Sequence, residues 1–388
     1  MNKENFVAKT FDGLEDILRT ELEELGAENC EVISRGVQFK GDFNLLYTIN
    51  YYSRLSLRIL WEVKRFKFRS NEEFYKAIKG FPAENYLRKN GNLSISASLH
   101  NTIFNTPLFA SLLAKDAICD RFREQSGERP SVDKENPDVR FHLHVYQHEA
   151  TLFLDSSGES LHKRGYKIAN HTAPINEVMA AGMIKLSGWK ADCDLIDFMC
   201  GSGTILIEGA MIALNIPAGF YRDRYGFMRW LNFDKAYWEQ LKEAADIRND
   251  VLINFYGFDI SARYLHMAID NVDHAGLCDF IRLKKRDFEE TSPVRTPAFV
   301  ILNPPYGERL SIPDLNAFYH SIGDTLKKKY AGCTAWIISS DLDALKSIGL
   351  HPTRKITLFN GQLECKFMRF EMYQGRKHEG ENDNGRTT

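Results

Sequence analysis

The chain has 388 residues, with 50 Lys and Arg, 52 Asp and Glu, and 44% hydrophobic residues. This length and composition are typical of a folded protein with two or three domains, and they exclude a small disulfide-stapled module, a collagen-like chain and a disordered chain. The seven cysteines include no CxxC pair, so we expect reduced thiols and no metal. No apolar segment is long enough for a membrane span, and the N-terminus lacks a signal sequence, which predicts a cytoplasmic protein without a membrane partner.

Short strands and helices alternate through the first 157 residues. The hydrophobic pattern predicts a first α+β domain over residues 1–56 and a second over residues 57–157. The expected strands are 6–11, 30–34, 36–40, 57–68, 92–99, 139–146 and 149–155, and the expected helices are 14–25, 42–51, 72–78 and 107–123.

Beyond about residue 170 the pattern changes to apolar strands separated by longer helices. These strands are 194–198, 253–259, 280–287, 298–305 and 333–340. Continuous apolar strands between helices predict an α/β domain over residues 158–374 with a doubly wound, mostly parallel sheet. Strands 355–359 and 366–372 are too close for a crossover helix, so we expect an antiparallel hairpin there. Residues 375–388 have nothing apolar to bury and are predicted to be a disordered tail.

A glycine-rich turn in DLIDFMCGSGT (194–204) follows the first of these strands and precedes a helix. Glycines allow a ligand to approach the turn closely, and a helix N-terminus presents free N–H groups. This pattern favours a nucleotide-like ligand. A dinucleotide fingerprint requires a third small residue, where this chain has Leu206, so that ligand class is excluded.

Three strands of the predicted sheet end in aspartates, namely Asp197, Asp259 and Asp287. Ligands of doubly wound sheets bind beyond the carboxyl ends of the strands, so these side chains are expected to converge. Asp259 is placed to bind a ribose diol, and Asp287 an adenine amino group. The alternative for each aspartate is that it caps the following helix or loop.

The next strand ends in Asn303-Pro304-Pro305-Tyr306, which is suited to chemistry on an exocyclic amine of a base. Oxygen atoms of Asn303 and Pro304 can accept the two N–H bonds and favour a tetrahedral nitrogen, while Tyr306 stacks on an extruded base. Such a site requires neither a nucleophilic side chain nor a metal. The alternative is a rigid Pro-Pro turn that only ends the strand.

DFMCGSGT, GFDIS, RDF and NPPYG, in this order, resemble the class I S-adenosylmethionine-dependent methyltransferases that modify exocyclic amines of bases. LHKRGYK (161–167), HTAPINEVMAAGMI (171–184) and NPPYGERL (303–310) resemble, more narrowly, the THUMP-domain RNA guanine-N2 methyltransferases. Within that group the chain is similar to the 23S rRNA guanine-N2 methyltransferase half of the ribosomal RNA large subunit methyltransferase K/L family. The resemblance implies a Rossmann-like methyltransferase domain at 158–374, after a ferredoxin-like domain at 1–56 and a THUMP RNA-binding domain at 57–157.

The resemblance also implies the roles of individual residues. Catalysis falls to Asn303, Pro304 and Tyr306. The cofactor S-adenosylmethionine is expected to contact Asp197, Cys200, Gly201, Ser202, Gly203, Thr204, Asp259, Ile260, Asp287, Phe288 and Asn303. One departure is Phe198, where the family usually has proline, so the path of this loop is open.

Basic residues interleave with aromatic residues between positions 51 and 69, a mixture suited to RNA phosphates and unstacked bases. The residues expected to bind RNA are Arg65, Lys67, Arg69, Lys163 and Arg164. The alternative is that the aromatic residues face the core and that Lys163 and Arg164 lie in a solvated linker. His142, His144 and His148 lie close together in sequence, but they lack a complete ligand set, so a polar or RNA-facing strand is favoured over a metal site.

The function predicted from the sequence is methyl transfer from S-adenosylmethionine to guanine N2, with 23S rRNA as the expected substrate. Transfer RNA and 16S rRNA are alternative substrates, because THUMP domains occur with enzymes acting on different RNAs. Two further alternatives are adenine-N6 methylation of DNA and a non-enzymatic RNA-binding assembly factor.

Overall fold

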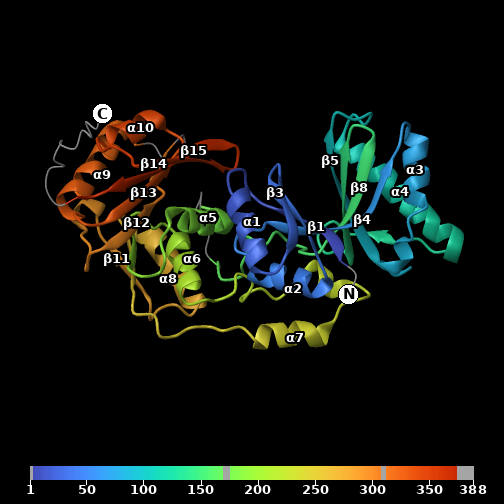
Figure 1. Cartoon of the computed structure of the whole chain (residues 1–388), viewed down its shortest axis with the longest axis horizontal. Coiled ribbons are helices and arrows are strands. Elements are labelled where there is room, and N and C mark those ends of the chain that lie inside the picture. Colours follow the sequence, from blue (N-terminus) through green and yellow to red (C-terminus); the bar gives the residue numbers. More distant parts are fainter. Residues whose placement is uncertain (1–2, 169–174, 307–311, 374–388) are drawn as a thin grey trace, which may run out of the picture. The chain divides into compact units, whose positions relative to one another are not determined.

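A computed structural model describes residues 3–168, 175–306 and 312–373 of the chain, which divides into two compact units (Figure 1). Unit 1 comprises residues 1–168, 176–182 and 214–249, and unit 2 comprises residues 169–175, 183–213 and 250–388. Helix α5 (Glu177–Ser187) contributes to both units. Among the described residues, no helix has the length and apolar character needed to cross a membrane.

Unit 1 contains one eight-stranded sheet that both predicted α+β domains share. Its strand order is β2-β3-β1-β4-β8-β7-β5-β6. The strands are β1 (Glu4–Lys9), β2 (Glu28–Ile33), β3 (Gly36–Gly41), β4 (Arg58–Lys67), β5 (Asn92–His100), β6 (Ser131–Val132), β7 (Val139–Tyr146) and β8 (Glu149–Asp155). Strand β4 joins the two halves, because it pairs antiparallel with β1 on one side and with β8 on the other.

The helices of unit 1 cover the apolar face of this sheet. They are α1 (Glu15–Glu24), α2 (Phe43–Tyr52), α3 (Asn71–Lys79) and α4 (Pro107–Ser126), with a short 3-10 turn η1 (Ala83–Asn85). Side chains of Asp42, Ser70 and Thr106 cap the N-termini of α2, α3 and α4 by accepting backbone N–H bonds. Phe6 of β1 and Phe141 of β7 belong to the same buried cluster, so the two predicted domains share one hydrophobic core.

Residues 214–249 return to unit 1 and complete its core, which the sequence pattern did not indicate. This segment contains the 3-10 turn η2 (Gly226–Arg229) and helix α7 (Lys235–Glu243). The ring centroid of Phe227 lies 4.7 Å from that of Tyr47, and Trp238 lies 5.5 Å from Tyr51. Aromatic pairs at these distances add favourable contacts to burial, which explains why the segment leaves unit 2.

Unit 2 contains a seven-stranded sheet with the order β11-β10-β9-β12-β13-β15-β14. The strands are β9 (Asp194–Asp197), β10 (Phe255–Asp259), β11 (Ile281–Lys285), β12 (Ala298–Leu302), β13 (Thr334–Ser339), β14 (Arg354–Asn360) and β15 (Leu363–Glu371). Strands β9 to β13 are parallel, whereas β15 pairs antiparallel with both β13 and β14. The predicted Rossmann-like sheet with a C-terminal antiparallel hairpin is therefore confirmed.

Helices pack on both faces of the second sheet (Figure 1). They are α6 (Thr204–Ala213), α8 (Ala262–His274), α9 (Leu315–Lys329) and α10 (Leu342–Ser347), with a 3-10 turn η3 (Phe288–Glu290) after β11. Successive strand residues point to opposite faces. Gly257 of β10 therefore approaches α6, where an added Cβ would lie 2.6 Å from Leu206, while Phe258 belongs to the buried cluster that includes Tyr319 of α9.

The domain boundaries expected after residues 56 and 157 remain predictions. The expected tail, residues 375–388, lies outside the described residues, as do residues 171–174 and 307–310 of the motifs that carried the family resemblance.

Candidate active site

A cavity of about 540 Å³ lies at the carboxyl ends of the parallel strands in unit 2. Strand β9 contributes Asp197, β10 contributes Asp259, and Asn303 directly follows β12. Strand β9 lies between β10 and β12, so the chain order reverses beside it. Ligand sites of open parallel sheets form at this point, because loops from neighbouring strands turn in opposite directions and leave a crevice.

Backbone hydrogen bonds shape the glycine turn between β9 and α6. Cys200 N donates to Phe258 O at 3.0 Å, and Gly203 N donates to Cys200 O at 2.8 Å. Gly201 and Gly203 have φ angles of +53° and +78°, a region that side-chain-bearing residues rarely adopt. A Cβ on Gly203 would also lie 3.3 Å from Ala268 Cβ on α8, so this glycine permits close packing of two helices.

The Asp259 carboxylate joins the glycine turn to the segment that begins α8. Its Oδ2 accepts a bond from Gly201 N at 3.0 Å, and its Oδ1 accepts one from Ser261 N at 2.8 Å. Asp259 therefore also caps the loop that follows β10, which was the alternative role expected for it. Each carboxylate oxygen has a second lone pair, so these two bonds leave acceptor capacity toward the cavity.

Asp197 presents a buried carboxyl group to the cavity wall. Its side chain is 2% exposed, and Oδ1 accepts a bond from Met199 N at 3.1 Å. Burial raises the pKa of Asp197 to about 8, the nearby Asp259 adds to this increase, and the Met199 N–H opposes it. The carboxyl group is therefore mostly protonated at neutral pH while the cavity holds no cation.

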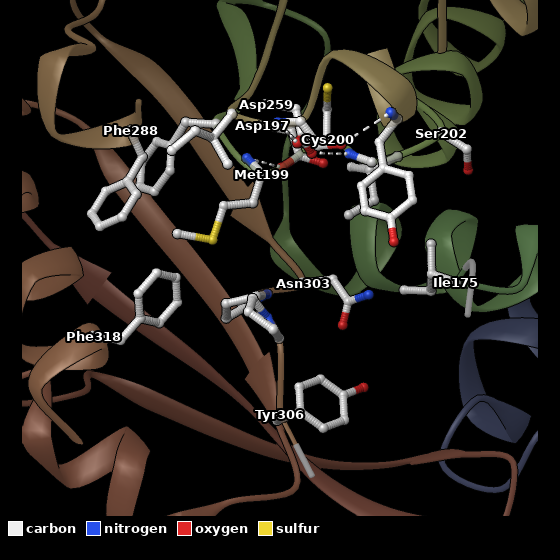
Figure 2. Close-up of a pocket in the computed structure, with 18 of the residues that line it drawn as sticks. Ile175, Asp197, Met199, Cys200, Ser202, Asp259, Phe288, Asn303, Tyr306 and Phe318 are labelled. Carbon is white, nitrogen blue, oxygen red and sulfur yellow. Dashed lines mark hydrogen bonds between the residues drawn. The ribbon is translucent and has the colours of Figure 1, made fainter. Parts of the chain in front are cut away.

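Phe198, which follows β9 in the glycine turn, lines the cavity as part of an aromatic cluster. Its ring stacks on Phe288 with centroids 5.8 Å apart and lies 5.6 Å from the ring of Tyr330. Phe288 in turn meets Phe318 edge-on at 5.5 Å. These rings make one wall of the cavity apolar, and Figure 2 shows Phe288 and Phe318 on the same side of it.

The turn after β12 places an amide oxygen in the cavity with its hydrogen-bonding capacity unused. Asn303 Oδ1 is buried, and no described residue donates a hydrogen bond to it. Figure 2 shows the Asn303 side chain between the two aspartates, Asp197 and Asp259, and the ring of Tyr306. A buried carbonyl oxygen without a donor is energetically costly, so this position favours a ligand that donates N–H groups.

The cavity brings together most residues predicted to bind the cofactor or to act in catalysis. The predicted residues that line it are Asp197, Cys200, Gly201, Ser202, Asp259, Ile260, Asp287, Phe288, Asn303, Pro304 and Tyr306. Gly203 and Thr204 do not line it, since they hold the turn and begin α6. Asp287 Oδ1 also accepts a bond from Glu289 N at 3.0 Å and so caps η3.

Sequence reasoning missed several residues of the lining, among them Ile175, Met199, Ile205, Ser261, Tyr264, Ile312 and Phe318. Met199, Ile205 and Ser261 lie within or next to recognised motifs, so their place was accessible from the motif positions. Ile175 lies within the segment 171–184 that carried the family resemblance, but no role was assigned to it, and Ile312 and Phe318 belong to no quoted motif. Only the folding of distant segments onto the strand ends brings them to the cavity.

The five residues predicted to bind RNA all lie in unit 1 and differ in availability. Lys67 and Arg69 are exposed at the end of β4. Arg65 is engaged by Glu62 and Glu149, and Lys163 pairs with Glu159 at 2.8 Å.

Arg164 is 2% exposed, and its guanidinium donates to Leu161 O at 2.9 Å and to Arg54 O at 2.6 Å. Arg164 therefore holds the chain within unit 1 instead of presenting its charge to a phosphate, which corrects its expected role.

The aromatic residues of the basic segment belong mainly to the core. Tyr51, Trp61 and Phe68 are buried in the cluster of unit 1, as the structural alternative proposed. His142 and His144 instead form a ladder with serines on the other face of the sheet. Ser98 Oγ lies 3.2 Å from His142 Nε2 and 3.0 Å from His144 Nδ1. No group of three potential metal ligands occurs within the described part of the chain.

Three family models match successive parts of the chain. A model described as RMKL-like, methyltransferase domain, matches residues 164–369. A THUMP domain model matches residues 68–155, and a model of the RlmL ferredoxin-like domain matches residues 5–60.

Similar proteins cover nearly the whole chain. The ribosomal RNA large subunit methyltransferase K/L of Methylococcus capsulatus is 35% identical over 95% of this chain and 51% of its own length. The chain thus spans about half the length of the K/L relatives it matches. A putative RNA methyltransferase of Synechocystis sp. is 35% identical over 95% of this chain and 97% of its own. A crystal structure of a putative methyltransferase complexed with SAH is 29% identical, with a TM-score of 0.88 over 97% of this chain and 100% of that one.

Proposed function

We propose that this chain, which belongs to the RMKL-like methyltransferase family, transfers a methyl group from S-adenosylmethionine to guanine N2 in RNA, with 23S rRNA as substrate. The observation that carries this proposal is the buried Asn303 Oδ1, which accepts no hydrogen bond from the described residues and faces the same cavity as Tyr306. This arrangement suits an exocyclic amine as the methyl acceptor, because such an amine donates N–H groups and belongs to a flat base.

The cavity residues fit S-adenosylmethionine. The volume of about 540 Å³ is in the range that encloses a ligand of this size. Asp197 offers a buried carboxyl to an ammonium group, and Asp259 retains acceptor capacity for a ribose diol. The solved relative with SAH, at 29% identity over nearly the whole chain, supports the same ligand here.

The bound cofactor would supply a methyl group on a sulfonium: the new N–C bond forms as the C–S bond breaks, sulfur keeps the electron pair, and the amine releases a proton to solvent. The nitrogen lone pair of an exocyclic amine is delocalised into the base, which makes the amine a weak nucleophile. Asn303 Oδ1 and the carbonyl of Pro304 would accept the two N–H groups and hold the nitrogen in an attacking geometry. Fixed acceptors of this kind act without reorganising during the reaction.

Tyr306 provides an aromatic face beside Asn303 for the target base. Its side chain is 6% exposed and lines the cavity, and Figure 2 shows its ring next to the Asn303 amide. A base reaches such a pocket only from a single strand or after extrusion from a helix. The roles of Asn303, Pro304 and Tyr306 therefore imply an unpaired or extruded guanine as substrate.

One end of the sheet in unit 1 offers a surface for RNA. Phe68 N donates to His148 O at 2.9 Å, which places Lys67 and Arg69 beside the turn between β7 and β8. Tyr146 near this turn is 52% exposed.

Phe109 of α4 is 45% exposed. It lies at the same end of the sheet, because its ring contacts Phe104, which stacks on Phe68. Exposed cations next to exposed aromatic rings suit phosphates and unstacked bases.

The experiment that tests the proposal uses the purified chain with S-adenosylmethionine and unmodified 23S rRNA, 16S rRNA, tRNA and duplex DNA. The products are digested to nucleosides and identified by mass spectrometry, with the Asn303→Ala variant as the inactive reference. N2-methylguanosine in 23S rRNA supports the whole proposal. The same nucleoside only in 16S rRNA or tRNA contradicts 23S rRNA as the substrate. N6-methyladenine in DNA contradicts guanine N2 as the methyl acceptor. No methylated product contradicts the enzymatic assignment.

A further inference from the structure

The hairpin β14–β15 reaches the aromatic ring of the proposed base site. Asn360, the last residue of β14, donates through Nδ2 to the phenol oxygen of Tyr306 at 2.9 Å. Cys365 Sγ of β15 lies 3.9 Å from the same oxygen. Asn360 does not line the cavity, so any effect on chemistry acts through Tyr306.

The register of the sheet brings these two residues together although 54 positions separate them. Strand β12, which precedes Tyr306, pairs with β13, β13 pairs with β15, and β15 pairs with β14. Asn360 faces Leu363 across the hairpin, and Gly361 makes the turn with a φ of +69°. A chain of backbone pairings therefore fixes where the Asn360 amide lies relative to the turn after β12.

A second contact holds the residue before Tyr306. The hydroxyl of Tyr319 on α9 lies 3.3 Å from Pro305 O and 3.0 Å from Ser339 Oγ, and Tyr319 is fully buried. The backbone of the turn is thus bonded to α9, while the ring of the next residue is bonded to the hairpin. Proline restricts the backbone of the turn, but it leaves the Tyr306 side-chain torsions to be set by contacts.

We propose that Asn360 is a positioning residue that sets the plane of the Tyr306 ring against which the target base stacks. This inference rests on the proposed function, because it assumes that Tyr306 stacks on the acceptor base. A ring held at its oxygen keeps one orientation as the base enters. Loss of this bond weakens the restraint on the ring, so fewer bound bases present their amine to Asn303.

A double-mutant cycle tests the inference with the full chain. Asn360→Leu removes the amide, and Tyr306→Phe keeps the ring but removes its oxygen without touching the hairpin. We expect each single change to lower kcat about fivefold, the size of one ordinary hydrogen bond, while the affinity for SAH stays unchanged. The double variant should lose no more than Tyr306→Phe alone, because that change already removes the oxygen to which Asn360 donates.

Gln362→Leu in the same hairpin is the matched control, since Gln362 is exposed and does not line the cavity. It should retain the wild-type kcat. Additive losses in the double variant, an unchanged kcat in Asn360→Leu, or an equal loss in SAH affinity would each overturn the role of Asn360. These results differ from failure of the proposed function, which appears as a wild-type chain that methylates none of the RNAs and overturns both.

Discussion

Polar groups are buried in the cavity of unit 2, but they are exposed at the end of the unit 1 sheet that carries Lys67 and Arg69, which we call the basic end. In the cavity, Asp197 and Asn303 Oδ1 are buried, and no described residue donates a hydrogen bond to Asn303 Oδ1. At the basic end, Lys67 and Arg69 are exposed to solvent. The difference teaches that chemistry on a small group depends on polar atoms fixed in a desolvated place, whereas contact with a polyanion depends on accessible charge.

The largest effect on turnover is expected at the buried amide of Asn303. Asn303→Ala should lower kcat by about 10²- to 10³-fold, because it removes a fixed acceptor from the reacting amine. Isothermal titration with SAH should show nearly unchanged affinity. Asn249→Ala, at an exposed position of unit 1, is the control and should be fully active. A variant at Asn303 with substantial turnover would contradict the proposed mechanism.

Lys163 and Arg164 are neighbours in sequence, but the first is exposed and the second is buried. Their substitution tests whether burial of a charged group determines its effect on stability. Arg164→Ala should reduce the free energy of unfolding by about 2–3 kcal/mol, because carbonyl oxygens of Leu161 and Arg54 lose a buried charged donor. Lys163→Ala should change it by no more than about 0.5 kcal/mol, as expected for an exposed ion pair. Urea denaturation measures both. Equal effects of the two changes would show that burial does not distinguish these residues.

Asp197 should link binding in the cavity to pH. Its carboxyl is largely protonated at pH 7, because burial raises its pKa to about 8. A ligand ammonium group favours the ionised form, so SAH binding should release about one proton per site at pH 7. Titration calorimetry in two buffers with different ionisation enthalpies measures this proton.

Asp197→Asn should abolish the release and weaken SAH binding about tenfold, the loss expected for one charged hydrogen bond. Asp343→Asn, in an exposed ion pair with Lys346, should leave both unchanged. Proton release that persists in Asp197→Asn would assign the titrating group elsewhere.

The same carboxyl group should make stability depend on pH. A pKa raised in the folded state means that the folded chain holds a proton that the unfolded chain loses near pH 4. Its contribution to stability is therefore fully present below about pH 4 and is lost as pH rises through about 8. Melting temperatures of the wild type should fall more steeply than those of Asp197→Asn between pH 5 and 8. Parallel curves would contradict the raised pKa.

The smallest effects are expected at the exposed end of unit 1. Lys67→Ala and Arg69→Ala should each weaken binding of single-stranded RNA a few-fold at about 0.1 M salt and reduce the slope of log K against log salt by about 0.7. Lys76→Ala is the control, because Lys76 is an exposed lysine of the same unit that pairs with Glu72. Fluorescence anisotropy over a salt series measures both quantities. An unchanged slope in both variants would place the RNA elsewhere.

The local sequence pattern predicted most elements and the convergence of the strand-end residues. Alternation of apolar residues located the strands, and the short connection between β14 and β15 required an antiparallel hairpin. In a parallel sheet the carboxyl ends lie at one edge, so Asp197, Asp259 and Asp287 were expected to meet, and they line one cavity. These inferences hold because spacing along a strand or helix determines which side chains share a face.

Tertiary structure alone decided the features that depend on distant partners. The return of residues 214–249 to unit 1, the burial of Arg164 against Arg54 O, and the contact of Asn360 with Tyr306 all join segments far apart in sequence. A basic residue has the same local pattern whether it faces solvent or a buried carbonyl. The chain by itself therefore determined its elements and the chemistry at the strand ends, while long-range packing decided which polar groups are buried, because burial depends on what other segments cover them.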